Sequence, residues 1–365
     1  MIKQLYDRIT EHIDGPLLTF LLIVMGLGLV VLYSASGGGN PDKVFSQARS
    51  MLIALIAMWL IANMHPQQMM RLALPIYVFG LVLLICVALF GDVSHGARRW
   101  LHVGVTRIQP SELMKLAIPL MLAWFFQRYE SNLHWKEFLF GALMLAIPAG
   151  LIIKQPDLGT TLLICASGFY VLFLAGLSWK LIIAGALSIA ALIPTVWPLL
   201  HDYQRRRVLT LLDPATDPLG AGYHIIQSTI ALGSGGIIGK GWMNGSQGHL
   251  DFLPEPTTDF IFAVFAEEFG FIGNMILLLL YILIIGRCLM ITANASTLFA
   301  RLLAGAITFT FFTYAFVNMG MVSGILPVVG VPLPLLSYGG TSLLTMLVGF
   351  GILMSIETHK QLVQS

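Results

Sequence analysis

Residues 223–273 read YHIIQSTIALGSGGIIGKGWMNGSQGHLDFLPEPTTDFIFAVFAEEFGFIG. Up to Asp259 this stretch is rich in glycine, amides, hydroxyls and charge, whereas the sequence on either side of it is apolar. It is neither repetitive nor low in complexity. A large polar segment between two apolar runs indicates a membrane protein whose chemistry lies at the membrane surface. Asp259, directly before the apolar run 260–265, is the first candidate functional residue.

The composition of the chain supports a membrane protein. Of the 365 residues 57% are hydrophobic and 10% are charged, and the mean hydropathy is +0.84. Water-soluble domains carry about 25% charged residues, so a soluble globule is excluded. The net charge of +2 comes without a dense Lys/Arg cluster and indicates no nucleic-acid partner. The three cysteines share no metal-ligand spacing and imply no disulfide framework.

Apolar runs long enough to cross a membrane recur along the whole chain. A spanning helix needs about 20 apolar residues, and the alternation typical of a membrane barrel is absent, so the spans are expected to be helical. The ten predicted spans are residues 16–36, 46–64, 71–91, 111–128, 138–153, 160–176, 180–199, 259–286, 299–320 and 338–356. The predicted fold class is therefore an all-α polytopic membrane protein of about ten transmembrane helices.

The sequence predicts one membrane domain over residues 1–365, with a large external loop at about 200–258 between the seventh and eighth spans. Within that loop, residues 225–232 are expected to form a short helix at the interface. An even number of spans places both termini on one side. Outside the long loop, Lys and Arg number 9 on the side of the termini against 7 on the other, which weakly favours cytoplasmic termini because positive residues concentrate there.

A second polar stretch, residues 94–115, leads into the fourth span. Ser111 is expected to cap that helix, with Glu112 in its first turn. Glu112 and Lys115 are three residues apart and share a helix face. One interpretation is an interfacial ion pair with a capping role. The other is that Lys115, with Arg98 and Arg99 nearby, binds an anionic headgroup.

Residues 154–160 (KQPDLGT) separate two short apolar spans and contain both a lysine and an aspartate. Charged side chains are costly inside a membrane, so Asp157 either lines an aqueous cavity or caps the helix that follows. Asp259 is expected in the first turn of the eighth span as a cap, a cation ligand or a general base. Glu267 and Glu268 lie deeper in the same span; one of them is expected to pair or cap, and the other is left unassigned.

Two glycine-rich stretches suggest special backbone geometry. Residues 233–241 lack the spacing and the preceding strand of a phosphate-binding loop, so their glycines are expected to permit tight turns or close backbone approach. Residues 318–342 combine prolines and glycines that break a helix, which is tolerated at membrane depth only against protein or a cavity. Residues 337–342 (SYGGTS) are expected to supply hydrogen-bonding groups there.

Two of these stretches resemble the signatures of the SEDS family (shape, elongation, division and sporulation proteins). The C-terminal pattern is Asn318, Gly324, Pro327 and Gly330 followed by LLSYGGTS at 335–342. The external-loop pattern runs from GSGG at 233–236 to PEPTTDFIF at 254–262. The runs GKGWMNGSQ and DFLPE resemble the elongation branch of the family more than the division branch. The resemblance covers essentially the whole chain.

The resemblance implies a peptidoglycan glycosyltransferase that polymerises lipid II at the outer face of the bacterial cytoplasmic (inner) membrane. Its implied partner is a class B penicillin-binding protein, the transpeptidase of the elongation complex. The implied catalytic residue is Asp259. The predicted substrate-binding residues are Glu112, Lys115, Asp157, Arg98, Arg99, Lys240, Gln247, Glu255 and Ser337. No nucleotide cofactor is expected, and a requirement for a divalent cation such as Mg²⁺ or Mn²⁺ is left open.

Transfer from an α-linked pyrophosphate donor to a β-linked polymer requires inversion, hence one displacement assisted by a base. Negative charge then develops on the departing undecaprenyl pyrophosphate, where Lys115, Arg98, Arg99 or Lys240 is expected to stabilise it. Two other functions are compatible with ten spans. A lipid II flippase or transporter is disfavoured because the polar residues cluster at one face rather than at the midplane. A non-enzymatic scaffold for the transpeptidase leaves the polar loop unexplained.

Overall fold

The computed structural model describes residues 11–38, 41–94, 97–103, 106–130, 133–155, 157–199, 205, 209–210, 213–214, 220–246, 253 and 255–359. Each of the ten predicted spans corresponds to a helix in these residues. The helices are α2 (Gly15–Ala35), α3 (Pro41–Ala62), α4 (Pro66–Phe90), α5 (Pro110–Arg128), α6 (Trp135–Ile153), α7 (Leu158–Leu174), α8 (Trp179–Val196), α12 (Ile261–Ala293), α13 (Leu298–Val322) and α14 (Gly340–Thr358).

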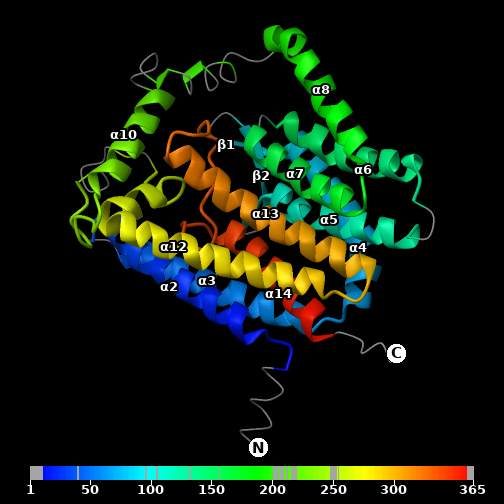
Figure 1. The fold of residues 1–365 in the computed structure, drawn as a ribbon, viewed down its shortest axis with the longest axis horizontal. Coiled ribbons are helices and arrows are strands. Elements are labelled where there is room, and N and C mark those ends of the chain that lie inside the picture. The colour runs from blue at the N-terminus through cyan, green and yellow to red at the C-terminus, as the bar shows by residue number, and fades with distance from the viewer. Residues whose placement is uncertain are drawn as a thin grey trace, which may run out of the picture.

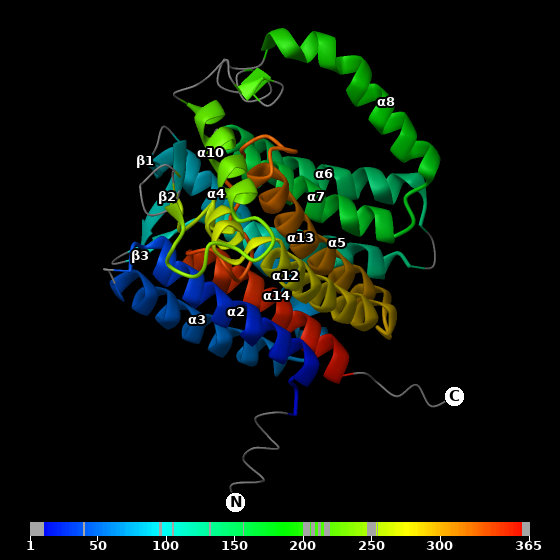
Figure 2. The ribbon, with the colours of Figure 1, turned by 60° about the vertical axis from the view of Figure 1, so that its left-hand side comes forward.

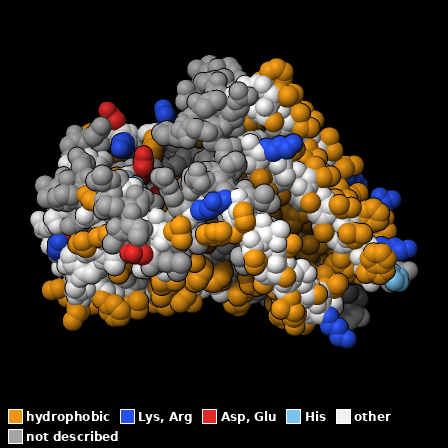
Figure 3. Space-filling model, turned by 90° about the horizontal axis from the view of Figure 1, so that it is seen from above, with side chains coloured by type: hydrophobic (Ala, Val, Ile, Leu, Met, Phe, Trp, Pro, Cys, Tyr) orange, Lys and Arg blue, Asp and Glu red, His pale blue; other side chains and the backbone are white. Residues whose placement is uncertain are grey.

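Seven of these helices in the described residues are long and apolar enough to cross a membrane: α2, α3, α4, α6, α12, α13 and α14. The apolar part of α8 and all of α7 are shorter, and α5 carries Glu112, Lys115 and Arg128. The outer surface fits a lipid environment. Leu52, Ile56 and Leu60 recur every four residues on α3 and are all more than half exposed, and hydrophobic side chains spread over much of the face in Figure 3.

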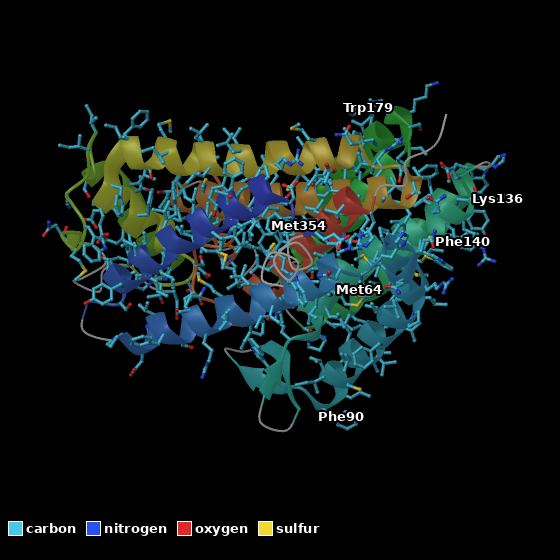
Figure 4. The ribbon with its side chains drawn as sticks, turned by 90° about the horizontal axis from the view of Figure 1, so that it is seen from below. Met64, Phe90, Lys136, Phe140, Trp179 and Met354 are labelled. Atoms are coloured by element: carbon cyan, nitrogen blue, oxygen red, sulfur yellow. The ribbon has the colours of Figure 1, made fainter. Side chains whose placement is uncertain are left out.

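The helices form a bundle around α5 and α13 (Figure 1). Both central helices bury most of their side chains, polar ones included. Helix α14 packs along α3, where Ser355 Oγ donates a 2.5 Å hydrogen bond to the carbonyl of Met64; Met64 and the neighbouring Met354 are labelled in Figure 4. Aromatic contacts such as that between Phe311 and Phe350 join α13 to α14.

The start of α2 and the end of α14 lie at the same end of the bundle. Arg287, near the end of α12, pairs with Asp14 at 2.5 Å and with Glu357 at 3.5 Å. Asp14 also caps α2 through its side chain. Helices α5, α7, α12 and α14 all begin at the opposite end, where α13 finishes. The bundle therefore has one end that gathers helix starts and irregular segments, and the functional site is found there.

A small antiparallel sheet between α4 and α5 was not predicted from the sequence. It consists of β1 (Asp92–Ser94), β2 (Ala97–Val103) and β3 (Thr106–Ile108) in the order β1-β2-β3. It follows Phe90, the exposed last residue of α4 (Figure 4). The strands are only three to seven residues long, too short to produce a clear alternating pattern.

Helix α8 stands away from the bundle in both ribbon views (Figures 1 and 2). None of its described side chains is buried. The short helix α10 (Ala221–Ser234) contains the predicted segment 225–232 and is longer than expected. It packs against α12.

Helix α12 is broken at Gly270, whose φ of 64° and ψ of −161° lie outside the helical region. We call residues 261–269, which precede this break, the short arm of α12. Every residue from Ile261 to Glu268 in it is buried. The chain is also non-helical between α13 and α14, as the glycines and prolines of residues 318–342 predicted, although α13 continues to Val322.

Candidate active site

A polar cavity of about 390 Å³ lies at the end of the bundle where α5, α7, α12 and α14 begin. It brings together Glu112, Lys115, Asp157 and Asp259, four of the residues that the sequence singled out. They come from the starts of two helices, α5 and α7, and from the segment before α12, and they are separated by up to 147 positions in the chain. The other lining residues are Trp100, Gln109, Leu158, Gly159, Thr160, Leu163, Tyr314, Val329, Gly330, Val331, Pro332, Thr341 and Ser342.

Asp259 precedes α12 rather than lying in its first turn. The helix begins at Ile261 with Phe260 as its N-cap residue. Residues 255–260 form backbone turns before it, in which the N–H groups of Thr258 and Phe260 both donate to the carbonyl of Glu255. Burial, and to a smaller extent the nearby charge of Glu255, raise the pKa of the Asp259 carboxyl to about 6. Asp259 is therefore a stronger base than an ordinary carboxylate.

The backbone that carries Asp259 is held by the C-terminal signature. Asn318 Nδ2 donates to the carbonyl of Asp259 at 2.9 Å and to the carbonyl of Val331 at 2.6 Å. Ser337 Oγ donates to the carbonyl of Thr258 at 2.7 Å, and the N–H of Tyr338 donates to Thr257 at 2.9 Å. These bonds join residues 257–259 to residues 331–338. The two stretches that carried the family resemblance are thus one structural unit.

Gly330 brings the C-terminal segment against the carboxylate of Asp259. Its φ is +78°, and a Cβ at this position would lie 3.3 Å from Asp259 Oδ2. On the other side of the segment, a Cβ on Gly159 would lie 2.8 Å from Val329 Cγ1. Glycine at both positions lets the segment 329–331 pass between Asp259 and the start of α7, and so it closes one wall of the cavity.

Glu112 and Lys115 form the ion pair expected from their spacing. Lys115 Nζ lies 2.5 Å from Glu112 Oε1 and 4.9 Å from the ring centre of Tyr314. Lys115 is 7% exposed. The second carboxylate oxygen of Glu112 is buried and has no hydrogen-bond partner among the described residues. The helix begins at Pro110 with Gln109 as N-cap residue, so the prediction that Ser111 caps it was wrong, because Pro110 occupies the first helical position instead.

Asp157 fulfils both interpretations that the sequence left open. Its carboxylate caps α7, accepting from the N–H of Thr160 at 3.2 Å and from Thr160 Oγ1 at 2.9 Å. It also lines the cavity. Asp157 is 6% exposed, and the cap fixes the direction of the carboxylate.

Three of the predicted substrate-binding residues lie outside the cavity lining. Lys240 Nζ pairs with Glu267 Oε1 at 2.6 Å. Ser337 Oγ is occupied by backbone groups, since it also accepts from the N–H of Leu333 at 2.8 Å. Glu255 is exposed beside Asp259 and acts on it through its charge. Lys240 and Ser337 thus make contacts within the protein, and their contacts with substrate stay a prediction.

The remaining predicted residues are Arg98, Arg99 and Gln247. Gln247 lies outside the described residues, and for Arg98 and Arg99 the structure describes only the backbone of β2. That strand continues to Trp100, which lines the cavity. The sequence analysis did not assign Gln109, Thr160, Tyr314, Thr341 or Ser342 individually to a cavity. Tyr314 gave no signal at all, since it lies within the apolar run of α13.

The electrostatic character of the cavity is acidic. Its described lining residues carry three carboxylates, of Glu112, Asp157 and Asp259, against the single ammonium group of Lys115. Among the described residues, no group of three or more His, Cys, Asp or Glu side chains is arranged to hold a metal ion. The cavity therefore offers a base, a positioned cation and several hydrogen-bonding groups that suit hydroxyls and amides.

Comparison with known proteins places this chain in a family. The family model for FtsW, RodA and SpoVE, described as a cell cycle protein, matches residues 16–362. The Escherichia coli K12 peptidoglycan glycosyltransferase MrdB is 49% identical over 99% of this chain and 97% of its own length. Stage V sporulation protein E of Bacillus subtilis 168 is 35% identical over 95% of this chain and 98% of its own.

Solved structures agree with the sequence comparison. A chain from a structure described as the coordination of polymerization and crosslinking by a peptidoglycan synthase complex matches with a TM-score of 0.83 at 35% identity. It covers 95% of this chain and 99% of that chain. The rod shape determining protein RodA of Thermus thermophilus matches with a TM-score of 0.72 at 28% identity, covering 95% and 98%. Both the helical membrane fold and the family resemblance are confirmed: this multi-pass membrane protein belongs to the FtsW/RodA/SpoVE family of cell cycle proteins.

Proposed function

We propose that this chain is a peptidoglycan glycosyltransferase that polymerises lipid II into glycan strands for cell elongation and rod shape. The observation that carries the proposal is the cavity in which Asp259, Glu112, Lys115 and Asp157 meet. The 49% identity to a peptidoglycan glycosyltransferase, over nearly the whole of both chains, supports the same reaction.

In the proposed reaction a hydroxyl of the acceptor sugar attacks the anomeric carbon of the donor. The new bond joins the hydroxyl oxygen to that carbon, while the bond from the carbon to the pyrophosphate oxygen breaks and its electron pair leaves with undecaprenyl pyrophosphate. The hydroxyl proton passes to the carboxylate of Asp259. One displacement of this kind inverts the anomeric carbon, as the change from an α-linked donor to a β-linked polymer requires.

Asp259 suits the role of general base. A base works best when its pKa is close to the working pH, and burial together with the charge of Glu255 brings the pKa of this carboxyl to about 6. At pH 7 most of the carboxylate is ionised and accepts a proton more readily than an ordinary aspartate. The hydrogen bonds from Ser337 and Asn318 hold the peptide groups directly before and after Asp259, which limits the movement of the base.

Lys115 is the cation that faces the cavity among the described lining residues, and we assign it to the departing pyrophosphate. Its pairing with Glu112 at 2.5 Å keeps the ammonium group charged and in place although the side chain is buried. A fixed charge that needs no rearrangement stabilises charge developing in the transition state. The amide of Gln109 and the hydroxyls of Thr341 and Ser342 are then available to sugar hydroxyl and amide groups.

We further propose that the cavity faces the outside of the cytoplasmic membrane and that both termini are cytoplasmic. The start of α2 and the end of α14 lie at the end of the bundle away from the cavity, and the count of positive residues weakly favours that end as cytoplasmic. The whole chain would act as one membrane domain. A class B penicillin-binding protein is the proposed partner, in keeping with a structural relative described as a peptidoglycan synthase complex.

The decisive experiment compares Asp259→Asn with the wild-type chain. Purified full-length protein, with its class B penicillin-binding protein, is incubated with lipid II in detergent and the glycan chains are separated by length. We expect no polymer from Asp259→Asn and normal polymer from the control Asp42→Asn, a change at an exposed aspartate in the first turn of α3. Full polymerisation by Asp259→Asn would overturn the catalytic assignment.

The same preparations distinguish the rival functions. In liposomes, lipid II translocation without any polymer would favour a flippase. Polymer that forms only when another glycosyltransferase is added would favour a scaffold. The proposed polymerase makes polymer in detergent, where there is no second compartment, without any added glycosyltransferase.

A further inference from the structure

The glycine-rich residues 235–246, which we call the glycine loop, fill the break in α12. On one side of the break the N–H groups of Lys240 and Gly241 donate to the carbonyls of Glu267 and Glu268, each at 3.0 Å. On the other side, the N–H groups of Phe271 and Ile272 donate to the carbonyls of Gly236 and Ile237, at 2.9 and 3.0 Å. A broken helix leaves peptide groups without partners, and the glycine loop supplies them on both sides.

The glycines are needed for this close approach. A Cβ on Gly239 would lie 2.1 Å from the carbonyl oxygen of Glu268, and one on Gly235 would lie 2.2 Å from that of Ala266. Gly239 also has a φ of +82°, which other residues rarely adopt. Figure 1 shows the loop that follows α10 against the start of α12. The expectation that these glycines serve backbone approach, and not phosphate binding, agrees with these contacts.

A buried charge cluster joins the glycine loop to the short arm of α12. Glu267 is 0% exposed. Its Oε1 accepts from Lys240 Nζ at 2.6 Å, and from the N–H and the hydroxyl of Ser246 at 2.9 Å each. The next residue, Glu268, accepts a hydrogen bond from Ser34 of α2. An ionised carboxylate is stable in such a place only with partners of this kind, so the cluster holds the loop and the arm together.

The short arm connects this cluster to the cavity. At about 1.5 Å per residue, residues 261–269 form an arm roughly 13 Å long. Asp259 lies two residues before its start and Glu267 lies near its end. Because the arm is buried along its length, a shift at the end that carries Glu267 moves the other end as well. The glycine loop thus determines the position of the start of the short arm, which follows Asp259.

We infer that Lys240 and Glu267 are positioning residues: through the glycine loop they fix the short arm of α12 and thereby hold the carboxylate of Asp259 in the cavity. This inference rests on the proposed function of Asp259 as the base. Neither residue lines the cavity, so their effect on the reaction is transmitted by the arm.

Loss of the positioning has a kinetic signature. A displaced base slows the chemical step without changing the contacts that bind substrate, and a misplacement of about 1 Å costs as much as 100-fold in rate. We therefore expect Lys240→Met to lower kcat by about 10-fold or more while KM stays near the wild-type value. A looser arm also admits water to Asp259, so the acidic limb of the pH–rate profile moves to lower pH.

The same helix contains a matched control. Arg287 pairs with the buried Asp14 at 2.5 Å on the other side of the Gly270 break, and its side chain is 23% exposed against 32% for Lys240. Both Lys240→Met and Arg287→Met leave a buried carboxylate without its cation, so both are expected to lower Tm. Only Lys240→Met is expected to lower kcat and to shift the acidic limb of the pH–rate profile. Lys240→Arg is expected to keep both near their wild-type values.

The test measures Tm, kcat, KM and the pH–rate profile of these full-length variants with lipid II. The inference would be overturned if Lys240→Met kept the wild-type kcat and acidic limb. It would also be overturned if Arg287→Met, at an equal loss of Tm, lowered kcat and shifted the acidic limb as much as Lys240→Met does. Should Lys240→Met not fold, Ser246→Ala decides, because it removes one hydrogen bond to Glu267: a smaller change in the same direction supports the positioning role, and an unchanged profile overturns it.

The two proposals fail in different ways. If Asp259→Asn still polymerises lipid II, the assignment of the base fails. If Asp259→Asn is inactive while Lys240→Met behaves as the wild type, the assignment stands and only the positioning role fails.

Discussion

The side-chain amide of Asn318 donates a 2.9 Å hydrogen bond to the backbone carbonyl of Asp259, 59 residues earlier in the chain. The same amide donates to Val331 at 2.6 Å. Asn318 is 0% exposed. One buried amide therefore holds together two walls of the cavity, the segment before α12 and the segment after α13.

Asn318→Ala is expected to destabilise the protein and to slow the reaction. It leaves a buried carbonyl oxygen, of Val331, and a partly buried one, of Asp259, without this donor, and a buried unsatisfied group costs about 1–3 kcal/mol. We expect a fall in the free energy of unfolding of about 2 kcal/mol or more, with a lower kcat because the backbone of Asp259 is released. Thermal unfolding and polymer assays measure the two effects.

Asn63→Ala is the control for this change. Asn63 Nδ2 also donates to a backbone carbonyl, of Trp59 at 2.7 Å, but the site is exposed and water replaces the lost donor. Its expected effect on Tm and kcat is small. An equal loss in both variants would show that the position of Asn318 between the two walls is unimportant.

The rate of polymerisation is expected to depend on pH through Asp259. The base acts in its ionised form, and its pKa is about 6, so kcat should fall as the pH decreases through about 6. Glu255→Gln removes a negative charge that raises this pKa, and the acidic limb should then move to lower pH. If Glu255→Gln leaves the acidic limb of kcat in place, or moves it to higher pH, a group other than Asp259 determines that limb.

Asp259→Asn is expected to retain or increase stability while losing activity. A carboxyl whose pKa is raised on folding, here from 3.8 to about 6, binds protons more tightly in the folded state. Its ionised form therefore destabilises the fold at pH 7, and the protein gains stability from this group as the pH falls from about 6 towards 3.8. The neutral amide removes that penalty. A large fall in Tm for this variant would indicate that Asp259 is a structural residue.

The Glu112–Lys115 pair is tested by a double variant. Removing one partner of a buried ion pair costs about 3–5 kcal/mol because the other charge stays buried and uncompensated. Lys115→Met should therefore lower Tm, and the addition of Glu112→Gln should recover it. If Lys115 also binds the departing pyrophosphate, the double variant stays inactive in spite of its recovered Tm. Recovery of both Tm and polymerisation would make the pair purely structural.

Gly330→Ala is expected to impair the reaction beyond its effect on stability. The φ of +78° disfavours alanine by about 1 kcal/mol, and the added Cβ would lie 3.3 Å from Asp259 Oδ2. Gly324→Ala is the matched control: its φ is +74°, and its Cβ would meet only Ile225 and Thr229, both at 3.5 Å. We expect Gly330→Ala and Gly324→Ala to lose similar amounts of Tm, and only Gly330→Ala to lower kcat. Equal kcat values would argue against crowding at the carboxylate.

The sequence by itself determined the class of the fold and the family. Apolar runs of spanning length recur because every membrane helix must match the same hydrocarbon thickness, and each of the ten predicted spans overlaps a helix whose bounds differ from the expected ones by at most seven residues. The polar residues were conspicuous for the same reason: charge is costly between such spans. The sequence could therefore single out the four charged residues of the cavity, Asp259, Glu112, Lys115 and Asp157.

The tertiary structure alone decided which of those polar residues meet. Lys240, which the sequence analysis predicted at the substrate, pairs with Glu267 on the short arm of α12. Ser337, which the sequence analysis predicted at the substrate, donates to the carbonyl of Thr258 and accepts from the N–H of Leu333. Tyr314 reaches the cavity from an apolar run that gave no signal. Sequence reports which groups are costly to bury, whereas their partners depend on packing between segments far apart in the chain.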